Sequence, residues 1–241
     1  MLYYKPCLWY NLPFPTALFM RNQRIQFDVF VGPAGAGKDT ITKQLVREVP
    51  HSTRMSTGDI CRGAKSGIGR YSYYQDEMNA EVERMDNGGL VSDEVAFSLT
   101  KQAVMKALVF GTNHFFLTGF PRNLAQLDMF DQWRTELQKI TGSEVGSRFI
   151  CLDLDPKLSD ERRRTRIEEA LAKGHEPRKD DREDVFLKRA AEYTEHTLPL
   201  VEALTREGRI KNVHVNGSIE ANYCKVREAL GLMQPSHPER R

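Results

Sequence analysis

The stretch VGPAGAGKDT, residues 31–40, decides the fold of this chain. Its Gly32, Gly37 and Lys38 have the G-x4-G-K spacing of a loop that cradles phosphate groups, and the apolar run IQFDVFV at 25–31 leads directly into it. After a strand and before a helix, this spacing indicates phosphate binding, because the backbone N–H groups of the loop and the start of the helix attract anions. A glycine-rich turn without a ligand would explain the glycines but not the lysine.

The loop departs from the usual sequence directly after its lysine. The consensus has Ser or Thr there, whereas this chain has Asp39, and the hydroxyl follows at Thr40. An acid among phosphates is unfavourable, since two like unit charges about 4 Å apart repel by ~4 kcal/mol at an effective dielectric of about 20. An acid at the start of a helix is favourable, however. The loop alone leaves open a decoy, a damaged site and a variant of the motif.

The composition is typical of a globular protein with a local anion site. Of the 241 residues 40% are hydrophobic and 28% charged, and the formal net charge is +2. So small a charge gives no general basic field, and we expect no nucleic-acid partner. The four cysteines, Cys7, Cys61, Cys151 and Cys224, form no CxxC pair. We therefore expect neither zinc nor a disulfide framework, and a reducing, cytoplasmic setting. No apolar run approaches the ~18 residues of a membrane span, so no membrane partner is expected.

Apolar runs alternate with helical patterns along most of the chain. We expect strands at 25–31, 52–56, 114–118, 148–154 and 212–215. We expect helices at 38–49, from an N-cap at Ser92 onward, and at 123–140, 182–207 and 219–230. This alternation predicts an α/β fold with a parallel sheet covered on both faces, and ligands that bind at the carboxyl ends of its strands.

Two polar segments interrupt the alternation and are interpreted as lobes inserted at the ligand edge of the sheet. They are residues 57–90 and 162–180. Residues 1–24 are rich in aromatics and proline and have too few Arg and Ser for a transit segment, so we expect a poorly ordered extension. The tail 233–241 is also expected to be disordered, which leaves one domain at 25–232.

Five motifs, in this order and spacing, resemble those of the adenylate kinase family of nucleoside monophosphate kinases. They are GPAGAGKDT at 32–40, STGDICR at 56–62, GGLVSDE at 88–94, TGFPRNLAQ at 118–126 and RKDDREDVFLKR at 178–189. The resemblance implies a three-layer P-loop core with a five-stranded parallel sheet, an inserted NMP-binding lobe at about 57–90 and a short lid at about 162–180. It also implies an ATP-dependent phosphotransferase.

The resemblance assigns roles to particular residues, and all of the implied catalytic residues are cations, as expected for a reaction that needs positioning and charge neutralisation. The implied catalytic residues are Lys38, Arg122, Arg166, Arg178 and Arg189. The implied ATP-binding residues are Gly32, Gly35, Ala36, Gly37, Lys38, Asp39, Thr40, Arg162 and Arg166. The implied AMP-binding residues are Thr57, Arg62, Gly89, Val91, Gly119, Arg122, Gln126, Arg178 and Arg189. We interpret Arg163 and Arg164 instead as a solvated face balanced by nearby acids.

Two positions favour AMP as the acceptor. In adenylate kinases the Thr of STGD and the Gln after GFPR face the adenine, and Thr57 and Gln126 occupy both places here. UMP/CMP kinases usually have a small residue and an Asn there, although they share the FPRN found at 120–123. A nucleotide-binding pseudokinase without turnover is the other alternative, and the retained catalytic arginines argue against it.

A second departure suggests how the first is tolerated. The family's Asp before GFPR, which helps to hold the magnesium shell, is Thr118 here. We hypothesise that an acid lost at Thr118 is regained at Asp39. Mg²⁺ is expected to enter with ATP, with Asp39 and Thr40 as the candidate residues beside it. Zinc is not expected, because the lid lacks the cysteines of zinc-bearing relatives. We expect a monomer.

Overall fold

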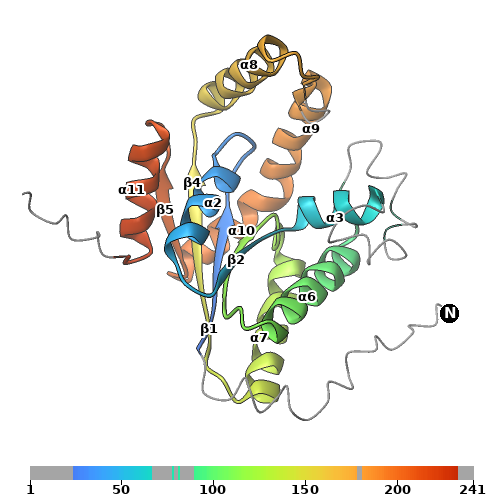
Figure 1. The fold of residues 1–241 in the computed structure, drawn as a ribbon, viewed down its shortest axis with the longest axis vertical. Coiled ribbons are helices and arrows are strands. Elements are labelled where there is room, and N and C mark those ends of the chain that lie inside the picture. The colour runs from blue at the N-terminus through green and yellow to red at the C-terminus, as the bar shows by residue number, and fades with distance from the viewer. Residues whose placement is uncertain (1–23, 67–77, 79–80, 82–89, 178–180, 233–241) are drawn as a thin grey trace, which may run out of the picture.

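A five-stranded parallel sheet in the order β2-β3-β1-β4-β5 forms the centre of the computed structural model (Figure 1). The structure describes residues 24–66, 78, 81, 90–177 and 181–232. The strands are β1 Ile25–Val31, β2 Ser52–Ser56, β3 His114–Thr118, β4 Val145–Asp153 and β5 Ile210–His214. The predicted α/β class is confirmed. β4 and β5 begin earlier than predicted, because their first residues pair with neighbouring strands although not all are apolar.

Helices join the strands and lie near the predicted positions. They are α2 Lys38–Glu48, α3 Thr57–Ser66, α6 Asp93–Val109, α7 Leu124–Thr141, α8 Pro156–Ala172, α9 Glu183–Glu192, the π-helical turn η4 Tyr193–Thr197, α10 Leu198–Arg206 and α11 Ile219–Ala229. Ser92 is the N-cap of α6, as predicted, but its side chain makes no capping bond. The helix predicted at 182–207 forms as one continuous helical stretch from Glu183 to Arg206, in which the π-helical turn η4 replaces α-helix just before Pro199, a residue that lacks the N–H of an α-helical bond.

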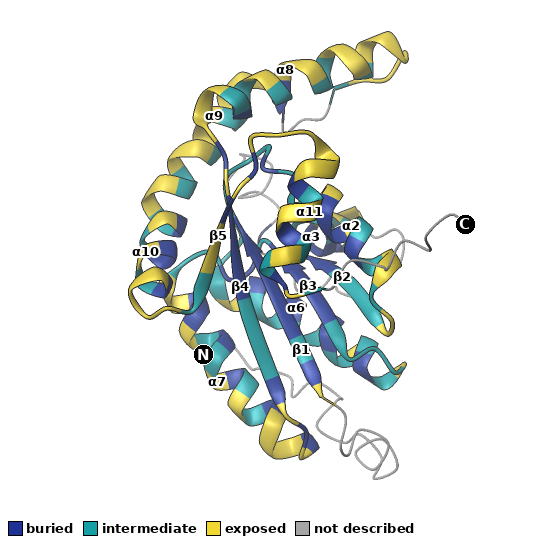
Figure 2. Ribbon diagram, turned by 90° about the vertical axis from the view of Figure 1, so that its left-hand side faces the viewer, coloured by how far each residue is buried: buried dark blue, intermediate teal, exposed yellow. Residues whose placement is uncertain are grey.

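The helices cover both faces of the sheet, so the core has three layers (Figure 2). Successive side chains along a strand point to opposite faces, and accordingly Phe27 of β1 belongs to one apolar core and Phe30 to the other. Helices α3, α6, α7 and α10 contribute to the Phe27 core, and α2 and α11 to the Phe30 core. This packing fixes the strands and therefore the loops at their carboxyl ends.

The central strand also carries a buried charge that the sequence analysis did not single out. Asp28 is fully buried in β1 and accepts hydrogen bonds from Arg148 Nε at 2.6 Å and Nη2 at 2.7 Å, with His114 Nε2 2.7 Å away. Burial alone would raise the pKa of Asp28, but the hydrogen bonds from His114 and Arg148 outweigh it and hold the pKa below its usual value. The group ties β1, β3 and β4 together.

The described parts of the two interrupting segments, α3 and α8, follow the carboxyl ends of β2 and β4. α3 opens the 57–90 segment, and most of that segment lies outside the described residues. α8 runs unbroken from Pro156, so the predicted lid boundary at residue 162 falls inside a helix, and the division into lobes stays a prediction. α8 and α9 project beyond the sheet (Figure 1). Among the described residues, no helix combines the length and apolar character needed to cross a membrane.

Candidate active site

The loop between β1 and α2 bends tightly, with three glycines at positive φ. Gly32, Gly35 and Gly37 have φ values of 143°, 78° and 82°. A Cβ atom on Gly32 would lie 2.5 Å from the backbone oxygen of Leu152 in β4, so only glycine fits there. Ser159 Oγ, at the start of α8, donates to the backbone oxygen of Ala34 at 2.7 Å and joins α8 to the loop. Sequence reasoning missed Ser159.

Lys38 lies over this loop at the first turn of α2. Its Nζ donates to the backbone oxygens of Gly32 and Pro33, both at 2.7 Å. Burial and the positive charges of Arg122 and Arg189 together lower the pKa of Lys38 to about 8, although the charge of Asp39 opposes them. The ammonium therefore lies where positive charge is already concentrated.

Other cations come to the same place from separate elements. Burial also lowers the pKa of Arg122, and the positive charges of Arg189 and Arg62 add to this. Lys38, Arg62, Arg122 and Arg189 thus share one electrostatic environment, although α2, α3, the loop after β3 and α9 carry them. We call these residues the cation cluster. Cations gathered at such a place attract a polyanion.

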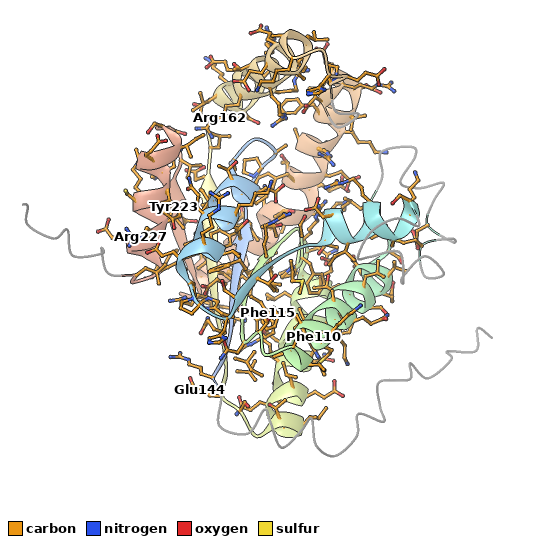
Figure 3. All side chains as sticks on the ribbon, in the orientation of Figure 1. Phe110, Phe115, Glu144, Arg162, Tyr223 and Arg227 are labelled. Atoms are coloured by element: carbon orange, nitrogen blue, oxygen red, sulfur yellow. The ribbon has the colours of Figure 1, made fainter. Side chains whose placement is uncertain are left out.

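The two arginines assigned to the lid point differently. Arg162 Nη2 donates to the backbone oxygen of Val215 at 2.7 Å, and its Nη1 donates to that of Gly35 at 3.2 Å. It therefore lies against the phosphate loop, at the end of α8 nearest the sheet (Figure 3). Arg166 is held by the buried carboxylate of Asp181, with one bond of 2.9 Å from Nε and a second from Nη2.

The solvated-face interpretation is wrong for Arg163. Arg163 is buried, donates to Asp160 at 2.8 Å and to the backbone oxygen of Asp181 at 3.0 Å, and its guanidinium lies 5.0 Å from the Phe186 ring centre. Its role is to pack α8 against α9. The interpretation is confirmed for Arg164, which is 68% exposed and pairs with Asp160. Helical spacing could not separate the two, because α9 covers only one side of α8.

The residues assigned to the acceptor base are buried and hydrogen bonded. Thr57 Oγ1 lies 3.1 Å from Thr100 Oγ1. Gln126 Oε1 accepts from the backbone N–H of Arg122 at 2.7 Å, and its Nε2 donates to Asp93 Oδ1 at 2.7 Å. Gln126 thus links Asp93 to the backbone of a cation-cluster residue. The sequence analysis assigned Asp93 no role in the site.

The remaining acceptor assignments are spread along the chain. Gly119 has a φ of 82° and accepts a 2.9 Å bond at its backbone oxygen from Arg122 Nε. Val91 packs against the Phe27 core. Gly89 and Arg178 lie outside the described residues, so their assignments stay predictions.

Asp39 belongs to a chain of alternating charges. Its Oδ1 accepts from Arg54 Nη1 at 3.0 Å, and Arg54 Nη2 donates to Asp59 Oδ2 at 2.5 Å. Asp59 Oδ1 in turn accepts from Arg62 Nη2 at 2.5 Å. We call Asp39, Arg54, Asp59 and Arg62 the charge chain. Sequence reasoning missed Arg54, because its two partners, Asp39 and Asp59, lie on separate helices.

The position of Asp39 bears on its tolerance beside phosphate. The Asp39 carboxylate lies 3.5 Å from the Thr118 hydroxyl, so the acid of α2 stands beside the position where the family has its own acid. Asp39 is 52% exposed, and Thr40 is exposed beside it. Both side chains are therefore accessible to solvent at the start of α2.

The donor set fits magnesium carried by ATP better than a resident metal. The described residues contain no group of three His, Cys, Asp or Glu side chains that could hold a metal ion. Mg²⁺ commonly keeps several waters and takes phosphate oxygens with one or two carboxylates. Asp39, half exposed beside the loop, suits that arrangement.

Comparison with known proteins places this geometry in a family. The family model described as Adenylate kinase matches residues 30–209. An adenylate kinase of Prochlorococcus marinus is 31% identical over 205 residues, which cover 84% of this chain and 97% of that protein. One from Thermus thermophilus is 30% identical over 204 residues, with 85% and 96% covered. Since the matched range contains the phosphate loop, the cation cluster and most of the sheet that positions them, the chain belongs to the adenylate kinase family.

Proposed function

We propose that this protein transfers the γ-phosphoryl group of ATP reversibly to AMP, giving two ADP. Membership of the adenylate kinase family makes it an ATP-dependent nucleoside monophosphate kinase. The observation that carries the proposal is the cation cluster at the ligand end of the sheet, in which burial and the charges of other cations lower the pKa values of Lys38 and Arg122.

The cluster suits phosphoryl transfer because its charges are fixed in advance. The transferring group carries negative charge over its oxygens, and donors already aimed at that charge need no reorganisation during the reaction. Crowded cations repel one another in the free protein, and bound phosphates relieve that repulsion. Arg122 is held by its own Nε bond to Gly119 and by Gln126 at its backbone N–H, so its position is set before substrate arrives.

Magnesium fits the same proposal. When bound with ATP, the ion would neutralise part of the negative charge of the phosphates. We infer that Asp39 and Thr40 are the residues that would lie beside the ion. The 3.5 Å contact between Asp39 and Thr118 supports the hypothesis that the acid has moved from one position to the other.

AMP is favoured over a pyrimidine acceptor by Thr57 and Gln126, which match the adenylate kinase pattern. The binding-only alternative is not favoured, because a simple binder would not need arginines at the transferring group. The proposal includes a monomer in the cytoplasm. The described cysteines Cys61, Cys151 and Cys224 are free, which fits a reducing compartment.

A coupled assay of ADP production tests this function directly. Wild-type protein is incubated with ATP and, in turn, AMP, dAMP, CMP and UMP, and AMP is expected to give the highest kcat/KM. Arg122→Gln should lower kcat by about a hundredfold or more, because it removes a donor to the transferring charge. Arg47→Gln, an exposed arginine at the end of α2, is the matched control.

Each other outcome has a distinct meaning. ATP binding by calorimetry without ADP production from any acceptor would indicate a pseudokinase. A higher kcat/KM with CMP or UMP would indicate the pyrimidine alternative. Light scattering of the purified protein should give the mass of one chain, and twice that mass would contradict the monomer.

A further inference from the structure

Arg54 lies outside every motif that the family resemblance uses. It is on β2, the strand at one edge of the sheet, and its partner in register on β3 is Phe116. Phe116 belongs to the Phe30 core under α2 and α11, so Arg54 leaves the sheet on the face that carries α2. Its side chain is only 17% exposed. An arginine so placed has little freedom to serve as a surface charge.

The guanidinium of Arg54 spans two carboxylates from different elements. Its Nη1 reaches Asp39 in α2 at 3.0 Å, and its Nη2 reaches Asp59 in α3 at 2.5 Å. A planar fork can hold two such acceptors at fixed positions, which the single ammonium of a lysine does less well. Asp59 then holds Arg62 of the cation cluster at 2.5 Å. Arg54 therefore stands between the phosphate loop and an acceptor-side arginine.

We propose that Arg54 is a positioning residue that holds Asp39 beside Thr118 and offsets its negative charge, so that the phosphate loop accepts ATP in spite of its acid. For the identity of the nucleotide this inference rests on the proposed function. While Arg54 holds Asp39, its positive charge offsets part of the negative charge that bound phosphates would otherwise meet. Released, Asp39 could turn toward the loop, where its charge repels the phosphates.

The inference predicts that Arg54 acts on ATP through Asp39. Arg54→Gln should weaken ATP binding about tenfold in the presence of EDTA, because the released carboxylate then repels unshielded phosphates. Excess Mg²⁺ should make the loss smaller. In an Asp39→Asn background, the same Arg54→Gln change should weaken binding by less than about threefold, since the charge that Arg54 controls is gone.

Titration calorimetry of the full chain with ATP at low ionic strength measures all four members of this cycle. Arg47→Gln is the matched control for loss of one arginine charge, because Arg47 is an exposed residue in the last turn of α2. It should change the ATP affinity by less than about twofold. Thermal melting of each variant reports any loss of folded structure separately.

Arg54→Lys keeps the inference testable if Arg54→Gln does not fold. It retains the charge but not the fork, and should weaken ATP binding by about threefold, again only when Asp39 is present. Equal losses in the wild-type and Asp39→Asn backgrounds would overturn the inference, since Arg54 would then act independently of the acid. A loss no greater than that of Arg47→Gln would also overturn it.

The proposed function can fail without this inference failing. Wild-type protein that binds ATP but phosphorylates no acceptor would contradict the kinase reaction and leave the binding cycle intact. Wild-type protein that binds no ATP would overturn both.

Discussion

At the residue scale, the site is a set of cations held close together before substrate arrives. Lys38 shows this most clearly, because burial and the nearby arginines lower its pKa to about 8. At a pH just below 8, some of the molecules therefore have a neutral Lys38. A bound polyphosphate favours the charged form and should raise the pKa again.

Binding of ATP should therefore take up protons. At pH 8 about half of the free molecules lack the Lys38 proton, so saturation with ATP should draw in about half a proton per molecule. The affinity should fall as the pH rises above 8. Calorimetry in buffers with different heats of ionisation measures the uptake. Lys38→Arg should reduce it to near zero, because arginine stays charged. Proton release by the wild type would contradict the assignment.

Asp39 is the residue whose role magnesium should reveal. Asp39→Gly removes the carboxylate that we place beside the metal shell, so ADP production should need several-fold more Mg²⁺ to reach half-maximal rate. The measurement is the rate as a function of Mg²⁺ at fixed ATP and AMP. Adding Thr118→Asp to Asp39→Gly should restore the original requirement. If Asp39→Gly instead gains activity at limiting Mg²⁺, the two positions do not compensate.

At the element scale, β1 does more than lead into the phosphate loop. It carries Asp28, buried between Arg148 of β4 and His114 of β3. A charge at this depth is stable only while its partners remain, so the trio fixes the register of three strands. The positions of the strands determine the positions of the loops at their carboxyl ends. The trio therefore also helps to position the site.

Asp28→Asn should destabilise the protein. We expect a loss of about 3 kcal/mol in the free energy of unfolding at pH 7, since Arg148 is left against a neutral partner. The folded pKa of Asp28 is lowered. Its contribution is therefore present above the unfolded value near 4 and is lost as the pH falls through the folded one. Urea unfolding at several pH values should show the difference from wild type shrinking below about pH 4.

The control for that change is Asp184→Asn. Asp184 also faces an arginine, Arg182, but its carboxylate is 64% exposed, so the midpoint of unfolding should barely move. An equal loss of unfolding free energy in both variants would show that the destabilisation does not depend on the burial of Asp28.

At the scale of the whole molecule, the site lies at the carboxyl end of the sheet, whereas the apolar cores that stabilise the fold lie over its two faces. The cation cluster, α8 and α9 lie at the carboxyl end, where α8 and α9 form a projecting arm (Figure 1). The apolar cores lie over the faces of the strands. A projecting arm that carries Arg162 and Arg166 should close over bound nucleotides, which excludes water from the reaction.

Closure of the arm should be visible by hydrogen exchange. The turn that follows α8, residues 173–177, should exchange several-fold more slowly when ATP and AMP are both present. The turn between α7 and β4, residues 142–144, lies at the opposite end of the sheet and should be unaffected. Exchange at both turns that slows equally would indicate general stabilisation rather than closure.

Much of this architecture was predictable from local patterns. β1, β2 and β3 have the predicted bounds, and α7 and α11 lie within about one residue of theirs, because apolar periodicity and caps such as Asn123 act over a few residues. The π-helical turn inside the helix at 182–207 was missed, although Pro199 is a local signal for an interrupted hydrogen-bond ladder. The burial of Arg163 was not predictable, because it depends on α9.

The sequence by itself determined the phosphate loop, the alternation of strands and helices and the residue types of the site. Each of these depends on the spacing of residues that are close in the sequence, and the periods of helix and strand determine which of those residues share a face. Only the tertiary structure decided which charges meet. Arg54 finds Asp39 and Asp59, and Arg148 finds Asp28 across 120 positions, because strand order and register bring them together. Local spacing contains neither strand order nor register, so pairings that depend on both become visible only in the folded chain.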